Sequence, residues 1–390
     1  MLVDMTDAWD RIKKLSFRFK DLTDIGIANI TASAISGIFW LYMAALLGTT
    51  HYGEVSYFIA VAGISGSIAS LGASNTIMVY TAKGEKIQPS IFFVVIISGI
   101  VTSIVLYLIY YNLGASLYVL GSLIFGLSVA DVLGRKCYRV YSKYVITQRI
   151  LMVGFVVLFY HAIGIEGVVL GYGLSFFPYF FRLYIGFRES KINFLPLKSR
   201  LGFMMNSYSF DLTRNFSGST DKLIIAPLFG YSLLGNYQLG IQFLTVLNLL
   251  PAIVFQYLLP QDASGNSNKM LKKIIILVSI GIAFLGIVLS PIVVPALFPK
   301  FKEAITIIQI VSFSVIPYTV NATYIPKFLG TGNSKIVLVG SLIYLTIQII
   351  TIVILGKVFG VNGIATSVVL ATASESAYLI SVNHFKVSSK

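Results

Sequence analysis

Charged residues are scarce in this sequence. Asp, Glu, Lys and Arg make up 11% of the 390 residues, whereas 56% are hydrophobic. Because soluble domains carry about 25% charged residues, this composition excludes an ordinary soluble protein. The sequence predicts an integral membrane protein.

Cysteine and histidine are also rare. Cys137 is the single cysteine, and the three histidines (His51, His161 and His384) lie far apart in the sequence. One cysteine excludes an intramolecular disulfide and a thiolate metal cluster. The sequence also lacks a nucleotide-binding loop and a nucleophile–base pattern. We therefore expect no catalytic residue, no metal site and no cofactor, so the protein should not be an enzyme.

Apolar segments follow one another along almost the whole chain. A helix needs about 20 apolar residues to cross the hydrocarbon core of a membrane. Twelve such segments can be placed, at approximately 22–47, 55–81, 88–111, 114–134, 144–162, 165–186, 205–228, 233–258, 271–297, 303–326, 334–355 and 361–382. They predict an all-α polytopic membrane protein. Pro178, Pro251 and Pro317 fall inside segments, where the missing N–H should kink the helix.

Basic residues outnumber acidic ones, with a net charge of +14. They recur between the apolar segments and form no nucleic-acid motif, so we expect anionic membrane lipids as partners and no nucleic acid. With a cytoplasmic start, all but five of the 29 Lys and Arg residues face the cytoplasm. The five are Lys300, Lys302 and Lys357 outside, and Arg214 and Lys222 within a segment. This bias predicts a multi-pass protein of the cytoplasmic (plasma) membrane with both termini cytoplasmic.

Glycine pairs indicate an internal repeat. LLGTTHYGEVSYF and LFGYSLLGNYQLG carry glycines at the same spacing, and Gly164-Ile-Glu-Gly167 echoes Gly360-Val-Asn-Gly363. The repeat predicts two parallel units of six helices. The expected divisions are an amphipathic cytoplasmic helix at 1–20, an N-lobe at 21–187, a cytoplasmic linker at 188–204, a C-lobe at 205–385 and a cytoplasmic tail at 386–390.

One polar stretch, from Asn206 to Gly230, interrupts this apolar pattern. Asp211, Arg214, Asn215, Asp221 and Lys222 recur at spacings of three and four, so a helix would present them on one stripe. Charged groups at membrane depth usually face a bundle interior or a wet cavity, and they mark a candidate functional site. Every other segment is expected to lack an interior Lys or Arg.

Several segments of the sequence resemble a known family. Three segments are similar to the polysaccharide-exporter, or O-antigen flippase, branch of the multidrug/oligosaccharidyl-lipid/polysaccharide (MOP) transporter superfamily. They are the hairpin that begins at Leu46, the run DKLIIAPLFGYSLLGNYQLG and the C-terminal run GVNGIATSVVLA. The likeness covers roughly residues 21–385. It implies two six-helix lobes in a V around a central cavity. Members often have more spans, whereas this sequence predicts twelve.

The resemblance also implies a function. It points to a flippase that moves isoprenoid-(pyro)phosphate-linked oligosaccharide across the membrane by alternating access, for cell-surface polysaccharide or glycoprotein assembly. Glycosyltransferases of the same pathway are then expected partners. The lipid II flippase branch carries arginines in its first spans. Here no basic residue lies between Lys20 and Lys83, which argues against a peptidoglycan precursor as substrate.

A flippase needs a cation for the phosphate and polar groups for the sugars. Arg214 and Lys222 are the predicted phosphate contacts, because a guanidinium stays charged and offers two parallel donors. Neutral or acidic groups complete the predicted substrate cavity: Asp211, Asn215, Asp221, Asn29, Asn236, Gln238 and Gln242. The alternative for the charged pairs is a structural role, in which they lock the helix to its neighbours.

Two other functions remain open. A cation-coupled multidrug or small-molecule antiporter of the same superfamily would depend on carboxylates, and Asp24 and Glu375 are the candidates for coupling to Na⁺ or H⁺. A membrane-embedded glycan polymerase would need a large outer loop with acidic residues, and no predicted outer loop is that long.

Overall fold

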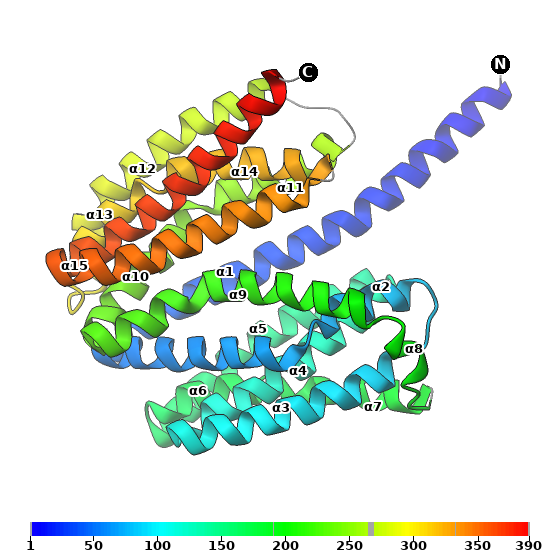
Figure 1. The fold of residues 1–390 in the computed structure, drawn as a ribbon, viewed down its shortest axis with the longest axis horizontal. Coiled ribbons are helices and arrows are strands. Elements are labelled where there is room, and N and C mark those ends of the chain that lie inside the picture. Colours follow the sequence, from blue (N-terminus) through cyan, green and yellow to red (C-terminus); the bar gives the residue numbers. More distant parts are fainter. Residues whose placement is uncertain (1, 190, 264–268, 332, 389–390) are drawn as a thin grey trace. The chain divides into compact units, whose positions relative to one another are not determined.

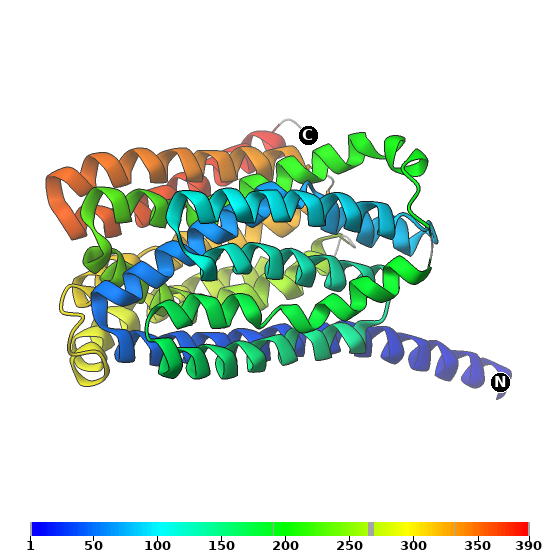
Figure 2. The ribbon, with the colours of Figure 1, turned by 90° about the horizontal axis from the view of Figure 1, so that it is seen from below.

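The chain folds into helices. The computed structural model describes residues 2–189, 191–263, 269–331 and 333–388, and within these ranges it contains no strand. Figure 1 and Figure 2 show the helices in two views. The all-α fold predicted from the apolar segments is confirmed.

Seven helical stretches are long and apolar enough to cross a membrane. They are 25–70 of α1 (Leu2–Ser70), α3 (Gln88–Tyr110), α4 (Leu113–Gly134), α5 (Tyr138–Ile163), α6 (Glu166–Leu174) with α7 (Phe180–Glu189), 272–297 of α12 (Lys269–Leu297), and 334–384 of α15 (Ser334–Ser388). Two bent pairs also qualify, α10 (Tyr231–Leu247) with α11 (Leu249–Ala263), and α13 (Ala304–Ser312) with α14 (Val315–Gly330).

The longest helices are each broken once by a glycine. The backbone of α1 leaves the helical region at Gly48, and that of α15 does so at Gly360. Each therefore supplies two of the predicted segments. With both halves of these helices, the two bent pairs and the 29-residue α9 (Leu201–Phe229), all twelve predicted segments have a helical counterpart.

The three prolines mark breaks in the helices. Proline cannot donate to the carbonyl four residues earlier, so a helix tends to stop there. α6 ends at Leu174, four residues before Pro178, and α10 ends at Leu247, four before Pro251. α13 ends at Ser312, five residues before Pro317. The bend is 49° between α10 and α11, and 42° between α13 and α14. The kinks predicted at Pro251 and Pro317 are confirmed, and at Pro178 a 3₁₀ turn over Phe177–Tyr179 interrupts the α-helix.

The helices group into two compact units. The first contains residues 1–39 and 65–211, and the second contains 40–64 and 212–390. The predicted lobe boundaries differ from this grouping, because 40–64 belongs with the second unit. A close backbone crossing accounts for that difference: an added Cβ at Gly53 would lie 1.9 Å from the carbonyl oxygen of Tyr231, and one at Gly235 would lie 1.9 Å from that of Thr49.

Glycines also bring together the helices of the first unit. α6 lies between α4 and α5. Gly167 and Gly171, one turn apart, bring α6 against the backbone of α5 at Phe159 and Phe155. Gly173 faces the backbone of α4 in the same way, at Leu117 and Tyr118. Small residues at this spacing allow membrane helices to pack closely, so the backbone contacts supply dispersion energy that bulkier residues would prevent.

The two glycine motifs of the predicted repeat have the same local geometry. Gly164 and Gly360 both have positive φ, with angles of 74° and 56°. Three residues later, Gly167 and Gly363 face the end of the preceding helical segment. An added Cβ there would lie 2.1 Å from the carbonyl oxygen of Phe159 and 1.9 Å from that of Leu355. Gly48 and Gly230 also correspond, with φ of 74° and 86°.

The predicted orientation can be tested by cysteine labelling in a Cys137→Ser background, since Cys137 is exposed. Gly53 and Gly235 have no room for a side chain, so exposed positions are better probes. Tyr111→Cys and Lys302→Cys should react with an impermeant thiol reagent in intact cells. Lys198→Cys and Lys335→Cys should react only after permeabilisation. The reverse pattern would overturn the orientation.

Candidate functional site

The polar stretch lies on α9 and is divided between the two units. Arg214 is part of this helix, and its side chain lies outside the described residues, as does that of Asp24 on α1. Asn215 is exposed. Asp211, at the end of the first unit, accepts hydrogen bonds of 3.1 and 3.2 Å from the amide of Asn75 on α2 (Ala73–Ala82). Asp211 therefore helps to hold α9 against α2.

Asp221 has several polar partners among the described residues. Its carboxylate, 7% exposed, lies 3.2 Å from the ammonium of Lys222, which is 13% exposed. The other carboxylate oxygen accepts a 2.8 Å hydrogen bond from the Tyr237 hydroxyl on α10. Lys222 also donates to the carbonyl of Gly218. This geometry gives the predicted ion pair a clear structural role within the second unit.

The polar groups around Asp221 continue toward α15. Gln348 is 2% exposed and interacts through its amide with the hydroxyls of Tyr237 and Tyr344. Its Oε1 atom is buried and has no hydrogen-bond partner. Tyr344 lies one turn before Gln348 on α15. Polar groups of α10 and α15 therefore continue from Asp221 into the interior of the second unit.

Glu375 lies further along α15. Its carboxylate accepts a 2.9 Å hydrogen bond from the amide of Asn321 on α14. The Asn321 oxygen accepts a 2.6 Å hydrogen bond from Ser376. Asn321 is 4% exposed, whereas Glu375 is only half-buried. Glu375 thus has one oriented partner and a part that remains accessible.

The predicted sugar-binding amides are placed in different surroundings. Asn29 accepts a 2.8 Å hydrogen bond from the Tyr141 hydroxyl within the first unit. Asn236 donates to Glu303 at 3.2 Å, and its own oxygen is buried without a partner. The Oε1 atom of Gln238 is also buried and unpartnered, and Gln242 lies one turn further along α10. The predicted cavity residues are thus divided between the two units.

A cation in the interior of α5 was not predicted from the sequence. Arg149 was counted among the basic residues that face the cytoplasm, but α5 begins at Tyr138, so Arg149 lies about 16 Å along the helix. The expectation that every other segment lacks an interior Lys or Arg is therefore wrong. The predicted segment 144–162 already contained Arg149, which was the available signal.

Arg149 is poorly compensated. Its Nη1 donates a 3.2 Å hydrogen bond to the Tyr172 hydroxyl, and its Nε is buried with no partner. None of the carboxylates whose side chains the structure describes forms an ion pair with it. Tyr118 packs edge-on against Tyr172, with ring centroids 4.9 Å apart. The first unit therefore holds a positive charge among tyrosines at membrane depth.

The buried carboxylate of Asp131 in the first unit was also not predicted from the sequence. Asp131 is fully buried near the end of α4 and accepts hydrogen bonds from Arg135 at 2.9 Å and from Nε of Arg182 at 2.8 Å. Arg135 also pairs with Glu189. Two cations and two carboxylates compensate one another here, which fastens α7 to α4.

Known structures with the same arrangement of helices are membrane transporters. The lipid II flippase MurJ in an inward closed conformation is 14% identical, with a TM-score of 0.76 over 92% of this chain and 87% of that chain. An inward-facing multidrug resistance MATE family transporter of the MOP superfamily is 12% identical, with a TM-score of 0.65 over 92% and 94%. A MOP superfamily transporter from Pyrococcus furiosus is 11% identical, with a TM-score of 0.61 over 95% and 96%.

No protein-family model and no curated protein sequence matches the chain. At such low identities the structural likenesses show the fold alone.

The structural role of Asp221 can be tested with a double-mutant cycle. Asp221→Ala should lower the free energy of unfolding by about 3–5 kcal/mol, because it strands the ammonium of Lys222 inside the unit. Asp221→Ala with Lys222→Ala should recover part of that loss. Thermal unfolding in detergent measures both, with Glu166→Ala at an exposed position as the control. Strictly additive losses would show that the pair contributes no coupling.

Proposed function

We propose that this chain, which has the fold of the MOP superfamily of membrane transporters, is a flippase for isoprenoid-(pyro)phosphate-linked oligosaccharide. It acts in the cytoplasmic membrane by alternating access, with both termini in the cytoplasm. The headgroup binds in the membrane interior through cations, and polar side chains contact its sugars. Glycosyltransferases of the same pathway would supply the substrate.

The observation that carries this proposal is the interior position of Arg149. A buried charge without a counterion costs several kcal/mol, so a helix that keeps one in the membrane usually does so for function. A phosphate supplies the missing negative charge, and a guanidinium binds it through two parallel hydrogen bonds. The unpartnered Nε of Arg149 is one such donor. A cationic drug would instead be repelled.

Arg214 is proposed as a second phosphate contact, since it is an arginine within the predicted segment 205–228. Lys222 is a weaker candidate because Asp221 and Gly218 already engage its ammonium. Asn29, Asn236, Gln238 and Gln242, together with Asp211, Asn215 and Asp221, remain the proposed polar lining for the sugars.

A cation-coupled antiporter is the second candidate function, favoured by the surroundings of Glu375. Antiporters need a carboxylate that can change its charge state, and Glu375 is half-buried with one oriented amide partner. The same feature fits a flippase driven by Na⁺ or H⁺. Coupling at Glu375, with Asp24 as the other candidate, is therefore proposed for either substrate.

Arg149→Gln should reduce flipping of a fluorescent isoprenoid-pyrophosphate oligosaccharide in proteoliposomes. Loss of a buried charged contact costs roughly 2 kcal/mol or more, so the rate should fall at least about 30-fold. Arg149→Lys should retain part of the rate, because it keeps the charge but loses the fork. Lys357→Gln, at an exposed position, is the matched control. Unchanged flipping in Arg149→Gln would remove the phosphate contact.

Arg214→Ala is assessed in the same assay. If Arg214 binds phosphate, flipping is lost while membrane abundance is kept. If it serves structure, Arg214→Ala lowers abundance and the double change with Asp211→Ala restores both. Efflux of a cationic dye by the wild type that persists in the Arg214→Ala variant, with no glycan flipping by either protein, would favour the antiporter.

Glu375→Gln tests ion coupling, because glutamine keeps the shape and the contact with Asn321 but cannot release a proton. Transport should lose its dependence on pH or sodium, and its rate in an imposed gradient should fall to that without a gradient. Ser374→Ala, at a half-buried neighbouring position, is the control. A Glu375→Gln protein with the full wild-type response to both gradients would exclude this role.

A further inference from the structure

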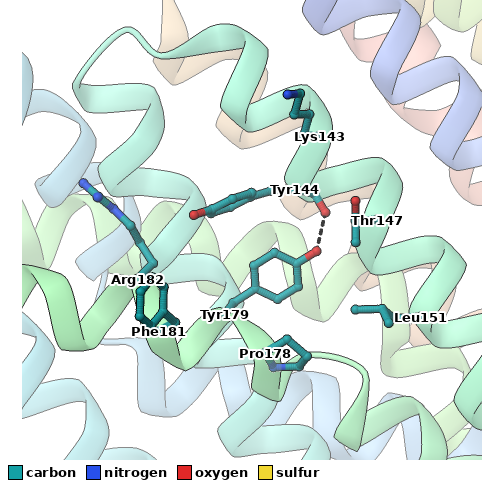
Figure 3. A pocket seen from close by; sticks show the side chains of 8 residues that line it. All are labelled: Lys143, Tyr144, Thr147, Leu151, Pro178, Tyr179, Phe181 and Arg182. Atoms are coloured by element: carbon teal, nitrogen blue, oxygen red, sulfur yellow. Dashed lines mark hydrogen bonds between the residues drawn. The ribbon is translucent and has the colours of Figure 1, made fainter.

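A cavity lies on the first unit, between α5 and the break that separates α6 from α7. Its volume is about 250 Å³. Figure 3 shows its lining, which α5 and the segment from Pro178 to Arg182 provide. The break exists because Pro178 interrupts the helix, and the short 3₁₀ turn η1 (Phe177–Tyr179) replaces a full helical turn there. The cavity is therefore a consequence of the proline.

The walls of the cavity are fixed. The Tyr179 hydroxyl donates a 2.7 Å hydrogen bond to the carbonyl of Tyr144, and the two rings pack with centroids 5.0 Å apart. Arg182 is 16% exposed and is held by fully buried Asp131. These contacts tie the broken segment to α5 and α4, so the cavity is formed before any ligand arrives.

The lining changes from basic to apolar along α5. Lys143, Thr147 and Leu151 follow one another at four-residue steps, about 6 Å apart along the helix axis. Arg139 precedes them by one more turn. Because α5 begins at Tyr138, Lys143 lies near the end that the charge bias places at the cytoplasm, and Leu151 lies deeper. Pro178 and Phe181 continue the apolar part from the other side.

The charged side chains around the Lys143 end of the cavity have a net positive charge. Arg182 and Arg135 are balanced by Asp131 and Glu189. Lys143 is exposed, and no carboxylate among the described side chains pairs with it. The hydroxyl of Thr147 lies one turn below it. An ammonium and a hydroxyl at this spacing suit a phosphate group.

We propose that this cavity binds the headgroup of an anionic phospholipid from the cytoplasmic leaflet. The phosphodiester lies between Lys143 and Thr147, and the glycerol and upper acyl chain lie along Leu151, Pro178 and Phe181. The apolar floor distinguishes this ligand from a free phosphate, which would gain nothing from it. Phe181 is 67% exposed, so the site opens toward the lipid. Basic pockets between membrane helices on the cytoplasmic side bind anionic headgroups in this way.

The test uses the purified full chain in phosphatidylcholine nanodiscs with increasing phosphatidylglycerol. Phosphatidylglycerol should raise the unfolding temperature of the wild type, and Lys143→Gln with Thr147→Val should weaken its apparent affinity at least roughly fivefold. Lys143→Arg should retain it. Lys198→Gln, at an exposed basic position away from the cavity, is the matched control and should behave as the wild type.

Two further arms separate the possible ligands. Soluble glycerol phosphate and inorganic phosphate should give no stabilisation, and a comparable effect of either would identify a free-anion site instead of a lipid site. Thr147→Trp, which fills the cavity, should abolish the response to phosphatidylglycerol while the protein still unfolds cooperatively. A full response in Lys143→Gln/Thr147→Val, or an equal loss in Lys198→Gln, would overturn the proposal by showing that the lipid acts through general surface charge.

Discussion

The cost of an unpaired charge in the membrane interior determines how this protein uses its few charged residues. A carboxylate or guanidinium away from water is tolerated only with a partner, a wet surface or a ligand. Asp131 has two arginines, and Asp221 has a lysine and a tyrosine. Arg149 alone of these interior charges has no described counterion. The unpaired state of Arg149 is informative because Asp131 and Asp221 satisfy the rule so completely.

Close backbone contact is the second constraint, and it explains why glycine recurs at matched positions. Membrane helices gain little from burying apolar side chains against one another, since lipid is equally apolar, so packing depends on close approach. Gly167 and Gly363 leave no room for a side chain, and their partners Gly164 and Gly360 adopt positive φ. The same requirement in both halves preserves the glycines as a visible repeat while the surrounding residues differ.

The sequence predicted the helical architecture well and the candidate site only in part. Hydrophobic length, proline position and glycine spacing act locally, so the twelve segments, the kinks and the repeat could be predicted from neighbouring residues alone. The grouping of 40–64 with the second unit depends on a crossing between Gly53 and Gly235, which are far apart in the sequence. In the same way, the polar groups that follow Asp221 include Gln348 and Tyr344, whose positions only the folded chain fixes. Arg149 was missed for a simpler reason: it was counted with the cytoplasmic basic residues that precede it in the sequence.

The distribution of charges over the two units bears on how transport could be driven. Arg149, which has no described counterion, lies in the first unit, whereas Asp221 and Glu375 lie in the second. In the proposed function the phosphate contact Arg149 and the coupling group Glu375 belong to different units, so coupling does not require contact between these two side chains. Coupling would arise because the substrate and the coupling cation each bind one global conformation more tightly than the other, and each shifts the equilibrium only by that difference in affinity. Glu375 on α15 contacts Asn321 on α14, so a change of charge at Glu375 would alter contacts between two elements of the second unit. That arrangement gives one protonation or cation-binding event a physical route to the packing of the second unit.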